Sequence, residues 1–197
     1  MHTAAATSTG ERILDVAEGL VQTRGVNGMS YADISAALGI TKASLHYHFP
    51  SKNDLVHALI DRYSGRFFRA LASIEETETD AAARLRAYAH VYGSVLEGGR
   101  MCLCGMLASD FQTLTPAGQA DVAAYFETNA EWLERVIAKG VREGQLSPTI
   151  SPRVAAATLL AGLEGAMLVS RPFEGMDRFD AIASALLLAL GVDDPRR

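Results

Sequence analysis

The stretch of this chain richest in chemically active side chains is residues 41–54, which read TKASLHYHFPSKND. It places His46, Tyr47, His48 and Lys52 in one short helical pattern that ends at a proline. Metal binding, catalysis and contact with nucleic acid all use side chains of these types. Residues two apart on a helix point in different directions, so the two histidines cannot hold one zinc ion well. We therefore expect no metal site here. For His48, a phosphate contact and a partly packed place at the helix end both stay open.

A second stretch holds the chain's two cysteines, Cys102 and Cys104, near the start of a predicted helix. One interpretation is that both are small buried apolar residues. Another is that one is a thiol sensor, because a helix N-terminus and Arg100 would lower its pKa. A metal site is a third, although C-x-C alone supplies too few ligands. A cysteine-nucleophile enzyme would need a base, and His90 is the only histidine in the C-terminal two-thirds. We therefore expect no enzyme and no cofactor.

The composition limits the classes of function. The 197 residues are 49% hydrophobic and carry a formal net charge of -5, so contact with nucleic acid must rest on a local cluster. Two cysteines cannot form a disulfide framework, and the N-terminus, MHTAAATSTGERILD, lacks the basic and apolar regions of a signal peptide. The most apolar stretch, VAAATLLAGLEGAMLV, contains Glu164 and is shorter than the roughly 20 residues of a membrane span. We expect a cytoplasmic protein with no membrane contact.

Helix signals run along the whole chain, and alternating strand patterns are absent. Capping residues mark several starts, because Ser30 precedes Asp33 by three positions and Ser51 precedes Asp54 in the same way. The predicted helices run from Ser8 to Gly25 and over residues 31–38, 42–49, 52–76, 80–97, 101–113, 116–143, 152–170 and 178–190.

The second and third predicted helices, joined by a turn with Gly39 and Ile40, have the lengths of a helix-turn-helix. Ile34, Ile40 and Leu45 are spaced to pack these two helices together and onto the first. Eight residues at 1.5 Å each give a helix of roughly 12 Å, which suits the major groove of DNA. Residues 1–57 hold four Lys or Arg against five Asp or Glu. We therefore expect modest non-specific affinity, and binding that depends on two copies of the chain.

The run ILDVAEGLVQTRGVNGMSYADISAALGITKASLHYHFPSKNDL resembles the N-terminal DNA-binding domain of the tetracycline-repressor (TetR) family. The resemblance implies all-α dimers that bind double-stranded operator DNA and release it when a small-molecule inducer enters the C-terminal domain. The leading hypothesis is a homodimeric repressor, and activation, which is less common, stays open. The residues that fit the family's pattern are Gly25, Ile34, Gly39, Ser44-Leu45, Tyr47-His48-Phe49 and Lys52-Asn53-Asp54-Leu55.

The resemblance places the DNA contacts on the third predicted helix and its flanks. Ser30 and Lys52 would hold the DNA backbone. The family usually has an aromatic residue where this chain has His46; a phosphate contact survives that change but becomes pH-dependent. The implied DNA-binding residues are Ser30, Thr41, Lys42, Ala43, Ser44, His46, Tyr47, His48 and Lys52.

The C-terminal two-thirds has apolar stripes with a few polar exceptions. Tyr88 and Tyr92 lie four apart on one helical face. Asn129 and Glu164 lie on otherwise apolar faces and need a partner, which is a ligand, another side chain or water. For these stripes, plain core and ligand wall both stay open. The candidate ligand-binding residues are Tyr88, Tyr92, Cys102, Met106, Phe111, Phe126, Asn129, Trp132 and Glu164.

Residues 98–114, GGRMCLCGMLASDFQTL, resemble a segment of TetR relatives that respond to acrylate or other reactive electrophiles. The alternative to a reversible inducer is therefore covalent modification of Cys102 or Cys104 by an electrophile or oxidant.

The last two predicted helices are apolar nearly all round, which is typical of helices buried on more than one face. Small residues four apart permit close approach, so these helices are the predicted interface of a homodimer. Two-fold symmetry would place two reading helices roughly 34 to 36 Å apart, one turn of DNA, or at a longer spacing. The candidate interface residues are Ala161, Gly162, Gly165, Ala166, Ile182, Leu186 and Leu190.

Together these patterns predict an all-α fold of about nine helices. An N-terminal three-helix domain with the helix-turn-helix is expected over residues 1–54. A larger C-terminal helical domain for ligand binding and dimerisation is expected over residues 55–197.

Overall fold

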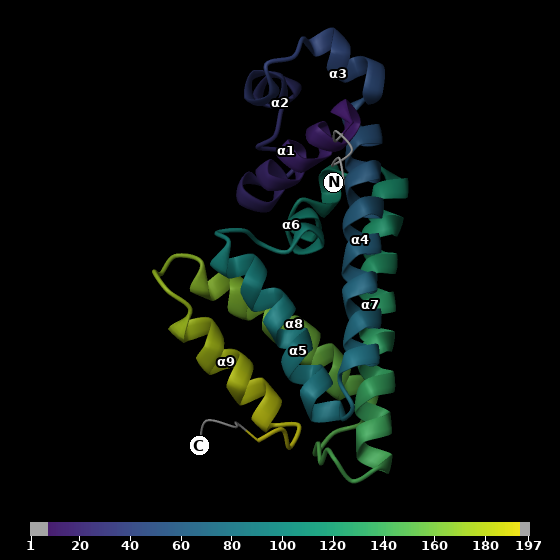
Figure 1. Ribbon diagram of the computed structural model, residues 1–197, viewed down its shortest axis with the longest axis vertical. Coiled ribbons are helices and arrows are strands. Elements are labelled where there is room, and N and C mark those ends of the chain that lie inside the picture. Colours follow the sequence, from purple (N-terminus) through teal and green to yellow (C-terminus); the bar gives the residue numbers. More distant parts are fainter. Residues whose placement is uncertain (1–7, 194–197) are drawn as a thin grey trace, which may run out of the picture. The chain divides into compact units, whose positions relative to one another are not determined.

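The computed structural model describes residues 8–193, and within this range every regular element is a helix (Figure 1). The all-α fold and the expected nine α-helices are therefore confirmed for the described residues. The elements are α1 (Thr9–Arg24), α2 (Tyr31–Leu38), α3 (Lys42–His48), α4 (Lys52–Thr77), α5 (Ala81–Glu97), α6 (Leu103–Ser109), the 3-10 helix η1 (Phe111–Thr113), α7 (Pro116–Arg142), α8 (Pro152–Ser170) and α9 (Asp177–Leu188).

Capping residues fix where α2 and α4 begin, as the sequence predicts. The Ser30 hydroxyl accepts a hydrogen bond from the Asp33 N–H at 3.2 Å, and the Asp33 carboxylate accepts one from the Ser30 N–H at 3.0 Å. Ser51 and Asp54 form the same reciprocal pair at 3.2 and 2.9 Å. These bonds satisfy N–H groups that have no partner inside the helix.

The helix predicted over residues 101–113 is divided in the structure. α6 ends at Ser109, and Asp110 leaves the helical conformation with φ -95° and ψ 15°. A hydrogen bond from the Thr113 N–H to the Asp110 carbonyl oxygen, at 2.9 Å, closes the tighter turn of η1. The Asp110 carboxylate instead accepts hydrogen bonds from the turn between α1 and α2, 84 residues away in sequence. No local sequence pattern reveals such a distant contact.

The chain forms two compact units. Unit 1 contains residues 8–64 and 103–122, and unit 2 contains residues 65–102 and 123–193 of the described chain. α4 and α7 each continue from one unit into the other. Compactness thus groups α6 and the start of α7 with the helix-turn-helix. This division follows compactness and not function. The expected boundary at residue 54, between the DNA-binding domain and the ligand-binding domain, remains a prediction.

Unit 1 is built on the apolar faces of α1, α2 and α3. α6 packs on α1 in the same unit. Because each of these helices is short, burial of one face holds it in place more than its intrinsic helix propensity does. The fully buried side chains that join them include Ile13, Ala17, Ile34, Leu45 and Leu55.

A charged cluster joins α4 to α1 within unit 1. The Arg62 guanidinium donates hydrogen bonds to Asp15 at 2.8 Å, to Glu18 at 2.9 Å and to Glu11 at 3.1 Å. These are three of the five carboxylates in residues 1–57. Arg62 therefore partly offsets the negative charge that weighs against DNA binding when the sequence alone is considered.

Unit 2 packs α8 against α9 and both of them against α5. By length and composition, α8 is the one helix within residues 8–193 that could cross a membrane, with a mean hydropathy of 1.3. Of that stretch, 44% is buried inside the protein, so α8 packs part of its apolar surface within unit 2 and leaves part of it exposed. Its buried residues include Leu159, Leu163 and Met167.

Candidate DNA-binding surface and ligand site

α3 is held in place by one buried face and two defined ends. α2 stops at Gly39, which adopts the left-handed conformation with φ 66°. The Thr41 hydroxyl then caps α3 by accepting a hydrogen bond from the Ser44 N–H at 3.1 Å. On α3 itself, Leu45 is fully buried and fixes the helix to the core of unit 1. The remaining faces of α3 are consequently left at the surface.

Most of the predicted DNA-contacting residues lie on these surface faces. Tyr47 is 85% exposed, although a large aromatic side chain usually buries much of its area. Lys42 and the Thr41 hydroxyl thus lie at the start of α3, and the His46 and His48 ring nitrogens lie in its last turn. All of these groups can contact phosphates or bases. The exposed members are Thr41, Lys42, Ala43, His46, Tyr47 and His48, and Ser44 is half-buried.

Three of the predicted contacts also hold the local fold. The Lys52 ammonium donates to the Met29 carbonyl oxygen at 2.8 Å, and the Ser30 hydroxyl donates within its capping box at 2.6 Å. His46 Nδ1 lies 3.1 Å from the Pro50 carbonyl oxygen. An ammonium group has three donors, so Lys52 retains the capacity to contact a phosphate as well.

Tyr31 joins α2 to the end of α3, a role that no sequence pattern predicts. Its hydroxyl donates to the Phe49 carbonyl oxygen at 2.8 Å, and its ring centroid lies 4.9 Å from that of His46. Burial raises the pKa of the Tyr31 hydroxyl to about 12, and the Asp54 carboxylate adds to the rise. The hydroxyl therefore remains a neutral donor at every physiological pH.

In unit 2, three polar side chains form a connected network inside the core. The Tyr88 hydroxyl donates to Asn129 Oδ1 at 3.0 Å, and Asn129 Nδ2 donates to the Tyr92 hydroxyl at 3.1 Å. The two hydroxyls lie 3.3 Å apart. Asn129 is fully buried, and burial raises the pKa of both tyrosines well above the ordinary value. The partner that Asn129 required is thus a pair of tyrosines.

Trp132 and Glu164 lie beside this network. We call the five residues together the buried polar cluster (Tyr88, Tyr92, Asn129, Trp132 and Glu164). The indole stacks on the Tyr88 ring at 5.6 Å between centroids. Trp132 Nε1 and Glu164 Oε1 are buried and have no hydrogen-bond partner within the described residues. Burial raises the pKa of Glu164 to about 7, and a hydrogen bond with Cys102 acts in the opposite direction. An unpaired donor and an unpaired acceptor in one buried region are suited to a polar ligand.

Neither cysteine forms a disulfide, and both are buried, with Cys102 2% exposed and Cys104 fully buried. Cys102 Sγ lies 3.9 Å from the Tyr125 hydroxyl, and the Tyr125 ring contacts that of Phe126 at 5.3 Å between centroids. Burial is the environment of a structural thiol more than of a reactive one.

Two of the predicted ligand residues belong to unit 1, whereas the others belong to unit 2. Met106 lies on α6 and Phe111 in η1, and both belong to unit 1. The Phe111 carbonyl oxygen accepts a hydrogen bond from Gln119 at 3.0 Å, a contact inside unit 1. Their role in ligand binding remains a prediction. The apolar pattern of the sequence predicted a helix over residues 101–113. It could not show which other helices that segment packs against.

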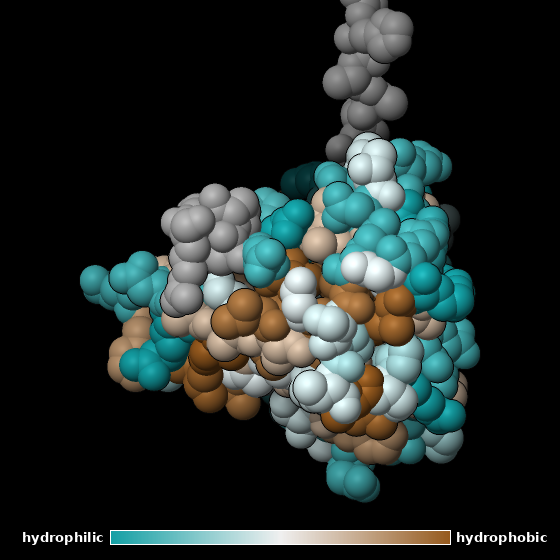
Figure 2. All heavy atoms as spheres, turned by 90° about the horizontal axis from the view of Figure 1, so that it is seen from below, coloured by the Kyte–Doolittle hydropathy of each residue, from teal (hydrophilic) through white to brown (hydrophobic). Residues whose placement is uncertain are grey.

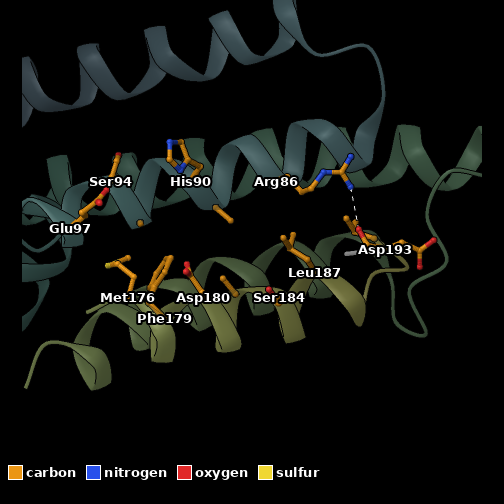
Figure 3. Close-up of a pocket in the computed structure, with 14 residues that line it drawn as sticks. Arg86, His90, Ser94, Glu97, Met176, Phe179, Asp180, Ser184, Leu187 and Asp193 are labelled. Carbon is orange, nitrogen blue, oxygen red and sulfur yellow. Dashed lines mark hydrogen bonds between the residues drawn. The ribbon is translucent and has the colours of Figure 1, made fainter. Parts of the chain in front are cut away.

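A cavity of about 400 Å³ lies elsewhere in unit 2, between α5 and α9 (Figure 3). Figure 3 shows Phe179 and Asp180 of α9, and Met176 directly before that helix, directed toward α5. Arg86 donates a hydrogen bond to the Asp193 carbonyl oxygen at 3.5 Å. None of the predicted ligand residues lines this cavity. A sequence signal existed, because polar residues recur at helical spacing along α5. These residues are Arg86, His90, Ser94 and Glu97.

α8 and α9 expose apolar side chains, among them Leu168 at 61% and Leu188 at 56%. Figure 2 shows that apolar side chains also lie exposed among polar ones on the face viewed from below. A Cβ added at Gly162 would lie 2.6 Å from Leu186 of the same chain, so this glycine serves the packing of α8 on α9. Of the predicted interface residues, Ala161 is exposed, Gly162, Gly165, Ile182 and Leu186 are half-buried, and Ala166 and Leu190 are buried within the protomer.

The fold and the exposed α3 define a helix-turn-helix DNA-binding protein with a second helical unit. Within residues 8–193, no three His, Cys, Asp or Glu side chains are grouped to hold a metal ion. Residues 13–59 match the family described as "Bacterial regulatory proteins, tetR family", and residues 81–186 match "Tetracyclin repressor-like, C-terminal domain". The chain therefore belongs to the TetR family, as its resemblance predicted. Its relatives are transcriptional regulators, so the protein is a regulator and not an enzyme.

Solved and characterised relatives agree with this assignment. A TetR-family transcriptional regulator from Agrobacterium tumefaciens is 34% identical, with a TM-score of 0.88 over 92% of this chain and 96% of that one. The transcriptional repressor DhaR from a Mycobacterium species is 25% identical over 84% of this chain and 85% of its own length. AibR, solved in complex with isovaleryl coenzyme A and operator DNA, shares the fold. Its TM-score is 0.73 at 24% identity, over 95% of this chain and 100% of that one.

Proposed function

We propose that this protein is a cytoplasmic, homodimeric repressor that leaves its operator when a small molecule binds in unit 2. The observation that carries the proposal is α3, a helix with one buried residue, Leu45, and with Lys42 and Tyr47 at its surface. AibR, which shares the fold, binds an acyl coenzyme A and operator DNA in one structure, which supports the combination of the two activities.

Selection from a random pool of DNA duplexes tests the DNA-binding part. Two copies of α3 related by a two-fold axis should enrich an inverted repeat, with half-sites separated by about one turn of DNA or by a longer fixed spacing. Enrichment of no sequence would contradict the proposal. A single half-site without its repeat would contradict the dimer but retain α3 as the reading helix.

The buried polar cluster is the proposed inducer site. It offers an unpaired indole donor and an unpaired carboxylate oxygen within an aromatic core, so a bound molecule gains hydrogen bonds without displacing existing ones. The mechanism is a population shift, in which the inducer binds better to a conformation whose two α3 helices are wrongly spaced for DNA. α4 and α7, which continue from unit 2 into unit 1, are the proposed levers.

Two variants separate the buried polar cluster from the α5–α9 cavity as the inducer site. Compounds are first screened for release of the selected duplex. Asn129→Leu should abolish the response to an active compound, whereas His90→Ala, in the cavity, should leave it intact. Trp132 is the chain's only tryptophan, so its fluorescence reports binding directly. The opposite pattern of loss would move the site to the cavity.

The proposed dimer interface is the exposed apolar face of α8 and α9. Leu168, Val169 and Leu188 are each about half exposed or more in the single chain. Apolar residues at such exposure are stabilised when a second copy covers them. The proposed interface leaves out Ala166 and Leu190, since the protomer already buries both.

Covalent modification of Cys102 or Cys104 is the alternative signal. The contact of Cys102 with Glu164 favours it, because a carboxylate can accept the thiol proton. The burial of both thiols weighs against it. Intact mass after exposure to an acrylate ester, with the Cys102→Ser and Cys104→Ser variants, separates the two signals. DNA release without a mass change would exclude covalent sensing.

A further inference from the structure

One carboxylate in unit 1 accepts three hydrogen bonds from the turn between α1 and α2. Asp110 Oδ2 accepts from the Val26 N–H at 2.8 Å and from the Asn27 N–H at 3.4 Å. Asp110 Oδ1 accepts from Asn27 Nδ2 at 3.0 Å. Hydrogen bonds to a charged acceptor are stronger than those between neutral groups. The three bonds therefore hold the α1–α2 turn strongly to Asp110.

The turn is shaped to receive this carboxylate. Gly25 ends α1 with φ 76°, a conformation that side chains with a Cβ rarely adopt. A Cβ added at Gly25 would also lie 2.7 Å from Asp110 Oδ2, inside contact distance. The residue type at Gly25 is thus set both by the backbone angle and by the nearness of the carboxylate.

Asp110 is itself rigidly held by α6 and η1. Its N–H donates to the Met106 carbonyl oxygen at 3.3 Å, and its own carbonyl oxygen accepts from the Thr113 N–H at 2.9 Å and from the Thr113 hydroxyl at 2.8 Å. α6 begins at Leu103, directly after Cys102, which contacts Glu164 of the buried polar cluster. Residues 103–110 therefore connect Cys102 to the carboxylate that holds the α1–α2 turn.

We propose that Asp110 is a positioning residue for operator binding. Its carboxylate fixes the α1–α2 turn to α6, and the orientation of α2 and α3 then follows the position of α6. The proposal rests on the proposed function, since it assumes that α3 reads DNA. It adds that a residue outside the helix-turn-helix, and without DNA contact, controls the affinity for the operator.

The sign of the effect separates positioning from simple electrostatics. Asp110→Asn removes one negative charge, and loss of a negative charge by itself strengthens binding to a polyanion. Asp110→Asn also weakens the bonds to the turn, which should weaken binding to the selected duplex about tenfold. Glu127→Gln, at an exposed position on α7, removes the same charge without any such contact and is the matched control. It should bind as tightly as the wild type or more tightly.

The experiment compares the full-length wild type, Asp110→Asn, Asn27→Ala and Glu127→Gln on the selected duplex and on a scrambled duplex. Positioning predicts that Asp110→Asn loses affinity for the selected duplex only, and that Asn27→Ala, which removes a single donor, shows a smaller loss. Equal affinities of Asp110→Asn and Glu127→Gln would overturn the inference, as would an equal loss on both duplexes. A wild type with no preference between the duplexes would overturn the proposed function as well, which distinguishes the two failures.

Amide hydrogen exchange distinguishes positioning from general loss of stability. In Asp110→Asn, exchange should accelerate at Val26 and Asn27 while the core amides of α1, such as that of Ala17, retain the wild-type rate. Acceleration at all of these amides would show that Asp110 acts only on global stability and would overturn the inference.

Discussion

Replacement of Glu164 by glutamine should reduce the pH dependence of the protein's stability near neutrality. Glu164 lies in the core of unit 2, where burial raises its pKa from the ordinary 4.5 to about 7. Between these two values the folded protein binds more protons than the unfolded chain, so stability falls as the pH rises through this window. A shift of that size corresponds to about 3 kcal/mol at 1.36 kcal/mol per unit. The neighbouring Tyr88 and Tyr92 hydroxyls have raised pKa values and stay neutral throughout.

Urea denaturation between pH 5 and pH 8, followed by the fluorescence of Trp132, measures this effect. The wild type should lose about 2 to 3 kcal/mol of unfolding free energy across that range relative to Glu164→Gln. From about pH 8, roughly a unit above the folded-state pKa, the two curves should run parallel, because Glu164 is then ionised in both the folded and the unfolded state. The Glu127→Gln variant, altered at an exposed position, should follow the wild type.

A wild type and Glu164→Gln variant with parallel stability curves from pH 5 to pH 8 would refute the reasoning. Such a result would mean that the Glu164 carboxyl is solvated or paired in the folded protein. The unpaired Oε1 on which the proposed inducer site partly depends would then have a partner, and that site would lose its acceptor.

Lys42→Ala should weaken binding to the selected duplex and reduce the salt slope by about one, whereas Lys139→Ala on the last turn of α7 should change neither. Equal slopes in anisotropy titrations would remove Lys42 from the DNA contacts. Gly25→Ala should lower the unfolding free energy by more than about 1 kcal/mol in urea, because of its φ of 76° and the nearby Asp110 oxygen. Leu168→Glu should convert the dimer to a monomer in sedimentation velocity, and an unchanged sedimentation coefficient would place the interface elsewhere.

Helix boundaries set by neighbouring residues could be predicted from the sequence. α2 spans Tyr31–Leu38 and α8 spans Pro152–Ser170, the same residues as in the prediction. In both cases the starting cap and the first helical residues are adjacent in sequence, so the signal is local. The family resemblance rests on the same kind of continuous local pattern.

Contacts between distant residues account for what the sequence did not reveal. The helix predicted over residues 101–113 is divided at Asp110. The Asp110 carboxylate there accepts a hydrogen bond from the Val26 N–H, 84 residues away in sequence. The α5–α9 cavity was missed for a similar reason, since its walls come from helices separated by most of unit 2. Asn129 was correctly expected to need a partner, but the sequence could not choose between a ligand and the two tyrosines.

The most direct test of α3 as a reading helix is the anisotropy of the wild-type protein on the selected and scrambled duplexes over a salt series. The selected duplex should bind at least about 1,000-fold more tightly at physiological salt, and affinity for both should fall steeply as salt is raised. Equal affinity for the two duplexes at every salt concentration would contradict the assignment of α3 as the element that reads DNA.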